Sequence, residues 1–240
     1  MPASSGTAVI AAIGDLHVRE DRAGSYRDLF AEISGKAEIL VLCGDLTDVG
    51  LPREAEILAE DLRACSIPMV GVLGNHDWES GHAEEVGRIL KDAGVRLLNG
   101  HSCEIQGVSF VGVKGFMGGF GRRMLASFGE APIKALVAES MSEAMRLENA
   151  MRIVQSERTI VVLHYAPVID TVDGEPLEIF PFLGCSRLAE TIDRFKVKAV
   201  VHGHAHHGRY DGRTPAGTPV YNVSLPIEKP SGRPYALIKA

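Results

Sequence analysis

The chain has 240 residues, a formal net charge of −6, and 45% hydrophobic and 23% charged residues. This length and composition are typical of a globular domain and exclude a disordered, collagen-like or coiled-coil protein. The negative net charge argues against a protein that binds nucleic acid through an overall positive field, although bound cations can still make one pocket positive.

The first part of the chain alternates apolar runs with helical patterns. Strands are predicted at residues 9–13, 39–43 and 69–73, and helices at 26–36, 53–64 and 84–93. This alternation is typical of βαβ units in a largely parallel sheet, and uninterrupted apolar strands fit a sheet covered on both faces. Asp15, Asp45 and Asn75 follow the three strands at intervals of 30 residues. We therefore expect all three at one carboxyl edge, where open α/β sheets bind ligands.

The rest of the chain is predicted to contain shorter strands and one long amphipathic helix. In chain order we expect strands at 95–98, 103–105 and 108–113, a glycine-rich loop at 115–129, a helix at 133–154, strands at 159–163 and 199–201, and final strands at 220–223 and 235–238. The last two strands are expected to be antiparallel or at an edge, and the methionines of the long helix to fill the core. Ser186 is expected to cap a short helix over 188–195.

Five polar motifs follow predicted strands, and their residue types can all bind or support a divalent cation. They are Asp15-Leu-His17, Gly44-Asp45-Leu-Thr-Asp48, Gly74-Asn75-His76-Asp77, His164, and Gly203-His204-Ala-His206. Each motif alone is weak, since Asp-x-His also occurs in surface turns and Gly-Asp in helix caps. Their conjunction at five strand ends predicts a metal centre, and imidazole and carboxylate ligands suit zinc, iron and manganese.

This series of motifs resembles the calcineurin-like metallophosphoesterase superfamily, over residues 15–206. The resemblance implies an α/β fold of two mixed β-sheets packed in a sandwich and flanked by helices, a four-layer αββα arrangement in a single domain at residues 1–240. It also implies two divalent metal ions, with manganese, iron or zinc as candidates. The implied ligands are Asp15, His17 and His206 for the first metal, Asn75, His164 and His204 for the second, and Asp45 as a bridge. A carboxylate suits the bridge because its two oxygens can serve two metals about 3.5–4 Å apart.

The resemblance gives His76 a catalytic role, as the group that protonates the leaving oxygen or stabilises the transition state. Asp77 would orient His76, and Asp48 would hold a metal ligand in position without binding the metal itself. Both carboxylates have an equally good alternative as helix-cap or turn residues.

The charge count of such a centre favours an anionic substrate. Two divalent ions, two carboxylates and a bridging hydroxide sum to about +1, so the pocket would attract phosphate within an acidic protein. The leading hypothesis is a phosphoric ester hydrolase that cleaves a small phosphodiester, with cyclic nucleotides as one candidate, by in-line attack of the bridging hydroxide. The alternatives are a phosphomonoesterase or nucleotide phosphohydrolase of the same fold, a non-catalytic scaffold module and, least favoured, a zinc hydrolase of carbon substrates.

Several residues outside the motifs have two interpretations each. Arg122 and Arg123 end a run of glycine and phenylalanine in the 115–129 loop, so they could clamp phosphate on a substrate flap or be solvated on a surface loop. Trp78 and the segment 165–184 could form an apolar wall for a nucleobase or aryl group, or simply pack. His202 is expected to pack beside its strand.

The chain carries no sequence signal for secretion or membrane insertion. The N-terminal MPASSGTAV has no basic segment followed by a long apolar one, and no stretch approaches about 20 apolar residues. The four widely spaced cysteines fit reduced thiols. We therefore expect a cytoplasmic protein that acts on a small phosphoester and has no membrane or stable nucleic-acid partner.

Overall fold

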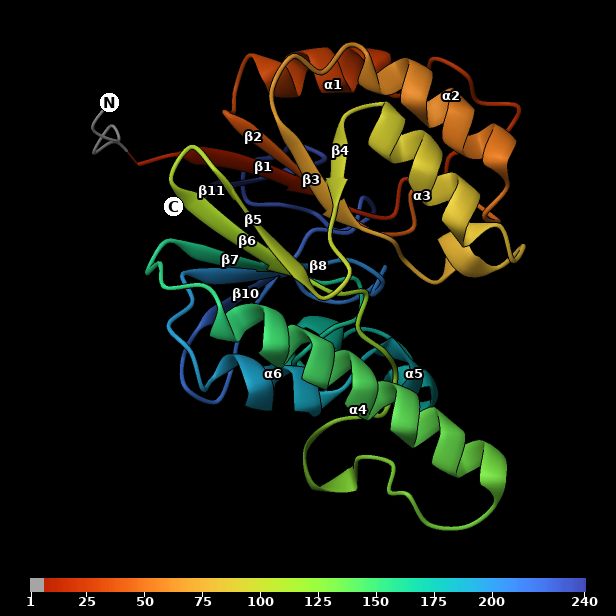
Figure 1. The fold of residues 1–240 in the computed structure, drawn as a ribbon, viewed down its shortest axis with the longest axis vertical. Coiled ribbons are helices and arrows are strands. Elements are labelled where there is room, and N and C mark those ends of the chain that lie inside the picture. Colours follow the sequence, from red (N-terminus) through yellow and green to blue (C-terminus); the bar gives the residue numbers. More distant parts are fainter. Residues whose placement is uncertain (1–6) are drawn as a thin grey trace.

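Two mixed β-sheets pack against each other in the computed structural model, which describes residues 7–240 (Figure 1). The first sheet has the order β11 (Ala236–Lys239), β1 (Val9–Ile13), β2 (Ile39–Cys43), β3 (Met69–Val72) and β4 (Val95–Leu97). The second has the order β5 (His101–Ile105), β6 (Val108–Gly112), β7 (Thr159–Val162), β8 (Ala199–His202), β10 (Pro219–Asn222) and β9 (Asp211–Arg213). The pairs β1–β2, β2–β3 and β3–β4 are parallel, as the alternating pattern predicts.

Helices cover the outer face of each sheet, so the protein has four layers (Figure 1). The first sheet is covered by α1 (Arg27–Ser34), α2 (Pro52–Leu62) and α3 (Ala83–Asp92). The second is covered by α4 (Ala131–Arg152) and α6 (Ser186–Ile192), with the short α5 (Phe180–Leu183) beside them. Short 3₁₀ helices occur at η1 (His76–Trp78), η2 (Gly121–Arg123), η3 (Asp170–Val172) and η4 (Leu177–Ile179). The expected sandwich of two mixed sheets flanked by helices is confirmed.

Alternating side chains of the strands divide the core into layers. Ile10 and Ala12 of β1 point into the cluster between the two sheets, while Ala11 and Ile13 point toward the helices of the first sheet. Because β1, β2 and β3 are apolar on both faces, they are held between two buried layers. This double anchoring fixes where each strand ends, and therefore where the motif residues lie.

Three details of the predicted elements differ in the structure. The strand predicted at 220–223 is antiparallel to β9, as expected, but it is also parallel to β8 and lies inside the sheet, because the short and exposed β9 covers its outer side. Ser186 does not cap a helix: it is the first residue of α6, and its hydroxyl accepts a hydrogen bond from the Gly121 amide. Met151 is buried as expected, but Met141 and Met145 of α4 are exposed.

The four cysteines are unpaired, as expected. No helix within residues 7–240 is long and apolar enough to cross a membrane. Part of the N-terminal segment for which no signal was expected, residues 1–6, lies outside the described residues.

Candidate metal centre

The polar motifs converge at the carboxyl ends of strands from both sheets. Their donor atoms form three clusters, each within 4.8 Å: Asp15, His17 and His206; His17, Asp45 and His76; and Asp45, His164 and His204. The first cluster contains the three residues of the first expected ligand set, and the third contains His164 and His204 of the second set together with Asp45. The amide oxygen Oδ1 of Asn75 lies 2.8 Å from His164 Nε2. Asp45 shares one cluster with His17 of the first expected set and another with His164 and His204 of the second, so its carboxylate lies next to ligands of both sets.

Glycines of the motifs allow the backbone to approach these side chains closely. A Cβ atom on Gly74 would lie 2.1 Å from Asp45 Oδ1, and one on Gly203 would lie 2.4 Å from Asp15 Oδ2. Gly44 has φ +80°, and a Cβ there would lie 2.6 Å from His164 Nδ1. All three distances are too short for any other residue, so these glycines define the space that the donor groups occupy.

The donors of the centre fit divalent metal ions. His17 Nε2 is buried and has no hydrogen-bond partner within residues 7–240, although it faces Asp45 Oδ2 at 3.9 Å. A buried polar atom without a partner is uncommon and calls for an explanation, which a bound cation would supply. Imidazole nitrogens, carboxylates and one amide oxygen together form a ligand set suited to zinc, iron or manganese.

The charges within the centre also favour bound cations. Burial alone would raise the pKa of Asp45, but the neighbouring His164 outweighs it and holds that pKa below its usual range. Burial raises and the hydrogen bond from His206 lowers the pKa of Asp15, with a net lowering. Burial lowers the pKa of His164, but Asp45 and Asp15 outweigh it and raise that pKa to about 9. Two buried carboxylates thus draw positive charge into the centre, and divalent cations would provide it.

His76 lies at the open side of the centre. Its amide N–H donates to Asp45 Oδ1 at 2.9 Å, and its Nε2 lies 4.0 Å from Asp45 Oδ2. Its Nδ1 is hydrogen-bonded to the main-chain carbonyl of Asp48. The Asp48 carboxylate lies 3.6 Å from His17 Nδ1, where it can hold the His17 ring in position.

Of the two roles expected for Asp77, the structure matches the turn carboxylate rather than the group that orients His76. Its carboxylate is fully buried and accepts hydrogen bonds from the amides of Leu46, Thr47 and Gly74 and from the Thr47 hydroxyl. These contacts join the loops after β2 and β3. The His76 ring is oriented by Asp48 instead, and Asp77 acts on the centre only through the loop geometry.

Two supporting residues escaped the sequence analysis. The Ser224 hydroxyl donates to Asp15 Oδ2 at 2.5 Å, and the His204 amide donates to both oxygens of the same carboxylate. The buried Lys229 ammonium donates to the Ser224 carbonyl. Ser224 follows a predicted strand, so its position could have been noticed, whereas Lys229 lies in a loop with no sequence signal.

A cleft of about 670 Å³ adjoins the centre, and Asn75, Trp78 and Tyr165 line it.

Arg122 and Arg123 are exposed in η2 and do not line this cleft. The preceding loop is fastened, because the amides of Gly118 and Gly119 donate to the carbonyls of Pro181 and Gly184. Gly118 is also closely packed, since a Cβ there would lie 2.9 Å from Cys185 Sγ. As expected, His202 is buried and packs, with Nε2 bonded to Thr171.

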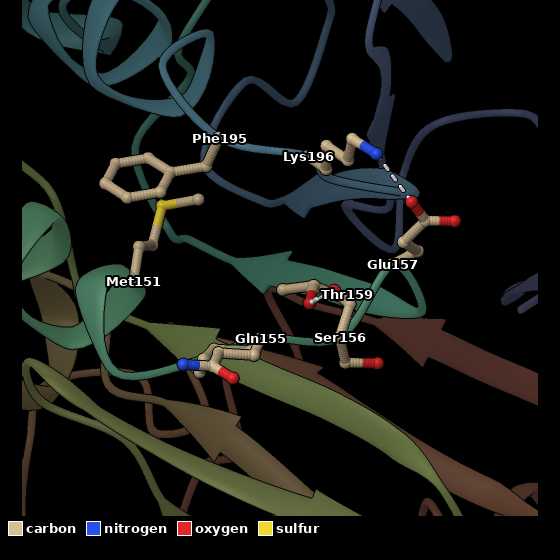
Figure 2. A pocket seen from close by; sticks show the side chains of 8 residues that line it. Met151, Gln155, Ser156, Glu157, Thr159, Phe195 and Lys196 are labelled. Carbon is tan, nitrogen blue, oxygen red and sulfur yellow. Dashed lines mark hydrogen bonds and ion pairs between the residues drawn. The ribbon is translucent and has the colours of Figure 1, made fainter.

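A second hollow lies away from the centre, at the start of β7 (Figure 2). Phe195 and Met151 form one side of it, and Lys196 pairs with Glu157 at 2.6 Å on the other. None of the centre's donor residues lines it.

Comparisons with known proteins agree with this fold and site. The model of the family described as calcineurin-like phosphoesterase matches residues 8–208. A curated relative, the probable glycerophosphodiester phosphodiesterase GpdQ of Arcobacter nitrofigilis, is 22% identical over 190 residues. The match covers 71% of this chain but only 57% of that relative's length.

Solved structures share the architecture. One aligns with a TM-score of 0.62 at 16% identity over 98% of this chain and 95% of its own. The protein TT1561 of Thermus thermophilus aligns with a TM-score of 0.56 at 15% identity, over 91% of this chain and 90% of that one. At these identities the likeness shows the fold alone.

Proposed function

The chain belongs to the calcineurin-like phosphoesterase family, and from this premise we propose that it is a dinuclear metal-dependent phosphoesterase that hydrolyses small phosphodiesters. The observation that carries the proposal is the position of Asp45, whose carboxylate lies close to His17 of one expected ligand set and to His164 and His204 of the other. One carboxylate between two ligand sets suits a pair of metals that clamp a phosphoryl group.

Seven residues would hold the metals in this proposal. They are Asp15, His17 and His206 on one side, Asn75, His164 and His204 on the other, and Asp45 between them. When bound, the ions would supply Lewis acidity and lower the pKa of the attacking water. Asp48 would keep His17 in position, and Ser224 would do the same for Asp15.

His76 is proposed to protonate the leaving oxygen. Because its Nδ1 faces the Asp48 carbonyl oxygen, Nδ1 must carry a hydrogen, which leaves Nε2 as the atom that holds and delivers a proton. Nε2 lies 4.0 Å from Asp45 Oδ2, so it faces the region where the phosphoryl group would lie. Its half-exposed ring also allows the proton to be replaced from solvent.

The preference for diesters is supported by one comparison. The curated relative is named as a probable glycerophosphodiester phosphodiesterase, but this chain matches little more than half of its length. A phosphomonoesterase or nucleotide phosphohydrolase remains the alternative enzyme. A scaffold module remains the non-catalytic alternative, although the full donor set and His76 argue against it.

The test is a matrix of metals and substrates. Protein freed of metal by a chelator is reconstituted with manganese, iron, zinc or magnesium and assayed with phosphomonoesters, phosphodiesters and cyclic nucleotides. We expect diester hydrolysis that requires added metal. Faster hydrolysis of monoesters than of every diester would overturn the diester preference, and a metal-loaded protein inert to all substrates would support the scaffold alternative.

A further inference from the structure

The cleft beside the metal centre shares residues with it. Asn75 lines the cleft, and its Oδ1 also lies 2.8 Å from His164 Nε2. Tyr165 lines the cleft as well, and the centroid of its ring lies 4.5 Å from the centroid of the His204 ring. A phosphoryl group held in the centre would therefore direct one of its ester substituents toward the cleft. The volume of about 670 Å³ is within the range of sites for small organic molecules.

Aromatic side chains from three separate segments form the walls of this cleft. Trp78 comes from η1 and lies two residues from His76. It is the chain's sole tryptophan, and 49% of its surface is exposed. Phe116 and Tyr165 are far apart in the sequence, but their rings are in contact, with centroids 5.8 Å apart. Leu73 and Leu97 add aliphatic surface. Trp78 is the most exposed of the three aromatic residues, since Phe116 is half-buried and Tyr165 is buried. An exposed apolar surface rimmed by polar residues is typical of a ligand-binding groove.

The charged groups that line the cleft are largely engaged with the protein itself. Glu143 accepts the Gly115 amide and pairs with Arg146 at 3.0 Å, and Arg146 also lies 3.9 Å from Glu139. The Lys114 ammonium lies 4.8 Å from the Phe116 ring centroid, where it is stabilised by a cation–π interaction. Glu84 and Lys91 also line the cleft, and the Lys114 ammonium lies near the Tyr165 ring as well, at 5.2 Å from its centroid. Trp78 is therefore the aromatic surface that is most open to a ligand.

We propose that this cleft is a specificity pocket that binds a planar aromatic ester group of the substrate, with Trp78 as the contact that selects for it. The inference rests on the proposed phosphoesterase function. It narrows the substrate class to phosphodiesters that carry a nucleobase or another aromatic ring. A planar ring can stack on Trp78 and pack against Phe116 and Tyr165, which a small polyol ester cannot do.

The kinetic test compares two diesters in the metal-loaded enzyme and two variants. The substrates are bis(4-nitrophenyl) phosphate, which is aromatic, and glycerophosphoethanolamine, which is not. In Trp78→Ala we expect the ratio of their kcat/KM values to fall about fivefold relative to the unmodified enzyme, because one aromatic contact is lost. Phe128→Ala is the matched control, since Phe128 is 88% exposed and lies outside the cleft. An unchanged ratio in Trp78→Ala would overturn the proposal.

A binding test separates this proposal from the hydrolase function. Because Trp78 is the sole tryptophan, intrinsic fluorescence reports on the cleft directly. Titration of the metal-loaded protein with phenylphosphonate should quench this fluorescence at about tenfold lower concentration than methylphosphonate. Equal concentrations for both would overturn the pocket even if the enzyme hydrolyses diesters. Selective quenching without hydrolysis of either diester would support the pocket and count against the phosphoesterase.

Discussion

Replacing Gly74 by alanine tests whether the motif glycines hold the donor groups in place. The added Cβ would lie 2.1 Å from Asp45 Oδ1 and 2.3 Å from Asp45 N, whereas an ordinary contact is 3.4–4 Å. Gly74 is not among the residues with positive φ, so alanine suits its backbone. The effect should therefore arise at Asp45 alone. Relieving the overlap requires a displacement of about 1 Å, and a misplacement of that size costs about 10²-fold in activity.

The assay measures metal content and kcat/KM on the same preparation. We expect Gly74→Ala to lose metal on dialysis and to lose about 10²-fold in kcat/KM toward bis(4-nitrophenyl) phosphate. Gly35→Ala is the matched control, because Gly35 has φ −85° and a Cβ there would lie 3.5 Å from the Glu32 carbonyl oxygen. Circular dichroism establishes that both variants are folded. A folded Gly74→Ala with full metal content and unchanged kcat/KM would refute the reasoning.

Three further substitutions separate the roles within the centre. Asp45→Asn should abolish activity and lower the metal content measured by elemental analysis, because an amide cannot replace the shared carboxylate; full metal with normal activity would rule out the bridge. His76→Ala should keep its metal but lose about 10²-fold or more in kcat, since only proton delivery is removed, and an unchanged kcat would exclude that role. Ser224→Ala should weaken metal binding about tenfold in a competition titration with a chelator, because Asp15 loses its hydroxyl donor; an unchanged affinity would show that the hydrogen bond to Asp15 is dispensable.

Much of the fold was predictable because its central strands carry strong local signals. Residues 9–13 and 39–43 are apolar throughout, and the structure has strands at these positions. β9 was missed because Asp211–Arg213 has no apolar pattern and two of its three residues are exposed. It forms a strand only because it pairs with β10, which is a tertiary effect. That same pairing moves β10 away from the sheet edge, which local sequence cannot reveal.

The candidate centre was predictable at the level of residue types, and less so at the level of contacts. Spacing brings Asp15, Asp45 and Asn75 to one edge, as the three donor clusters bear out for the two carboxylates. The partner of each side chain depends on loop paths. Asp77 therefore contacts two loops rather than His76, and Lys114 reaches the cleft from the end of β6 without any motif around it.

Several residues of the centre adopt a backbone conformation that side chains rarely tolerate. Within residues 7–240, the non-glycine residues with positive φ are Asp15, His17, Asp45, Gln106 and His204, with φ between 44° and 73°. Four of these five belong to the expected ligand set. Such conformations cost about 1 kcal/mol or more each and persist only where the surroundings enforce them.

Hydrogen bonds between the ends of β1 and β2 hold these residues in their positive-φ conformations. The Asp15 amide donates to the Gly44 carbonyl, and the His17 amide donates to the Asp45 carbonyl, so the strained turns after β1 and β2 are mutually fixed. Both strands are buried on both faces by apolar layers. The free energy that keeps the donors preorganised therefore comes from the sandwich core. This explains why the ligand geometry depends on glycines and strand ends as much as on the ligands themselves.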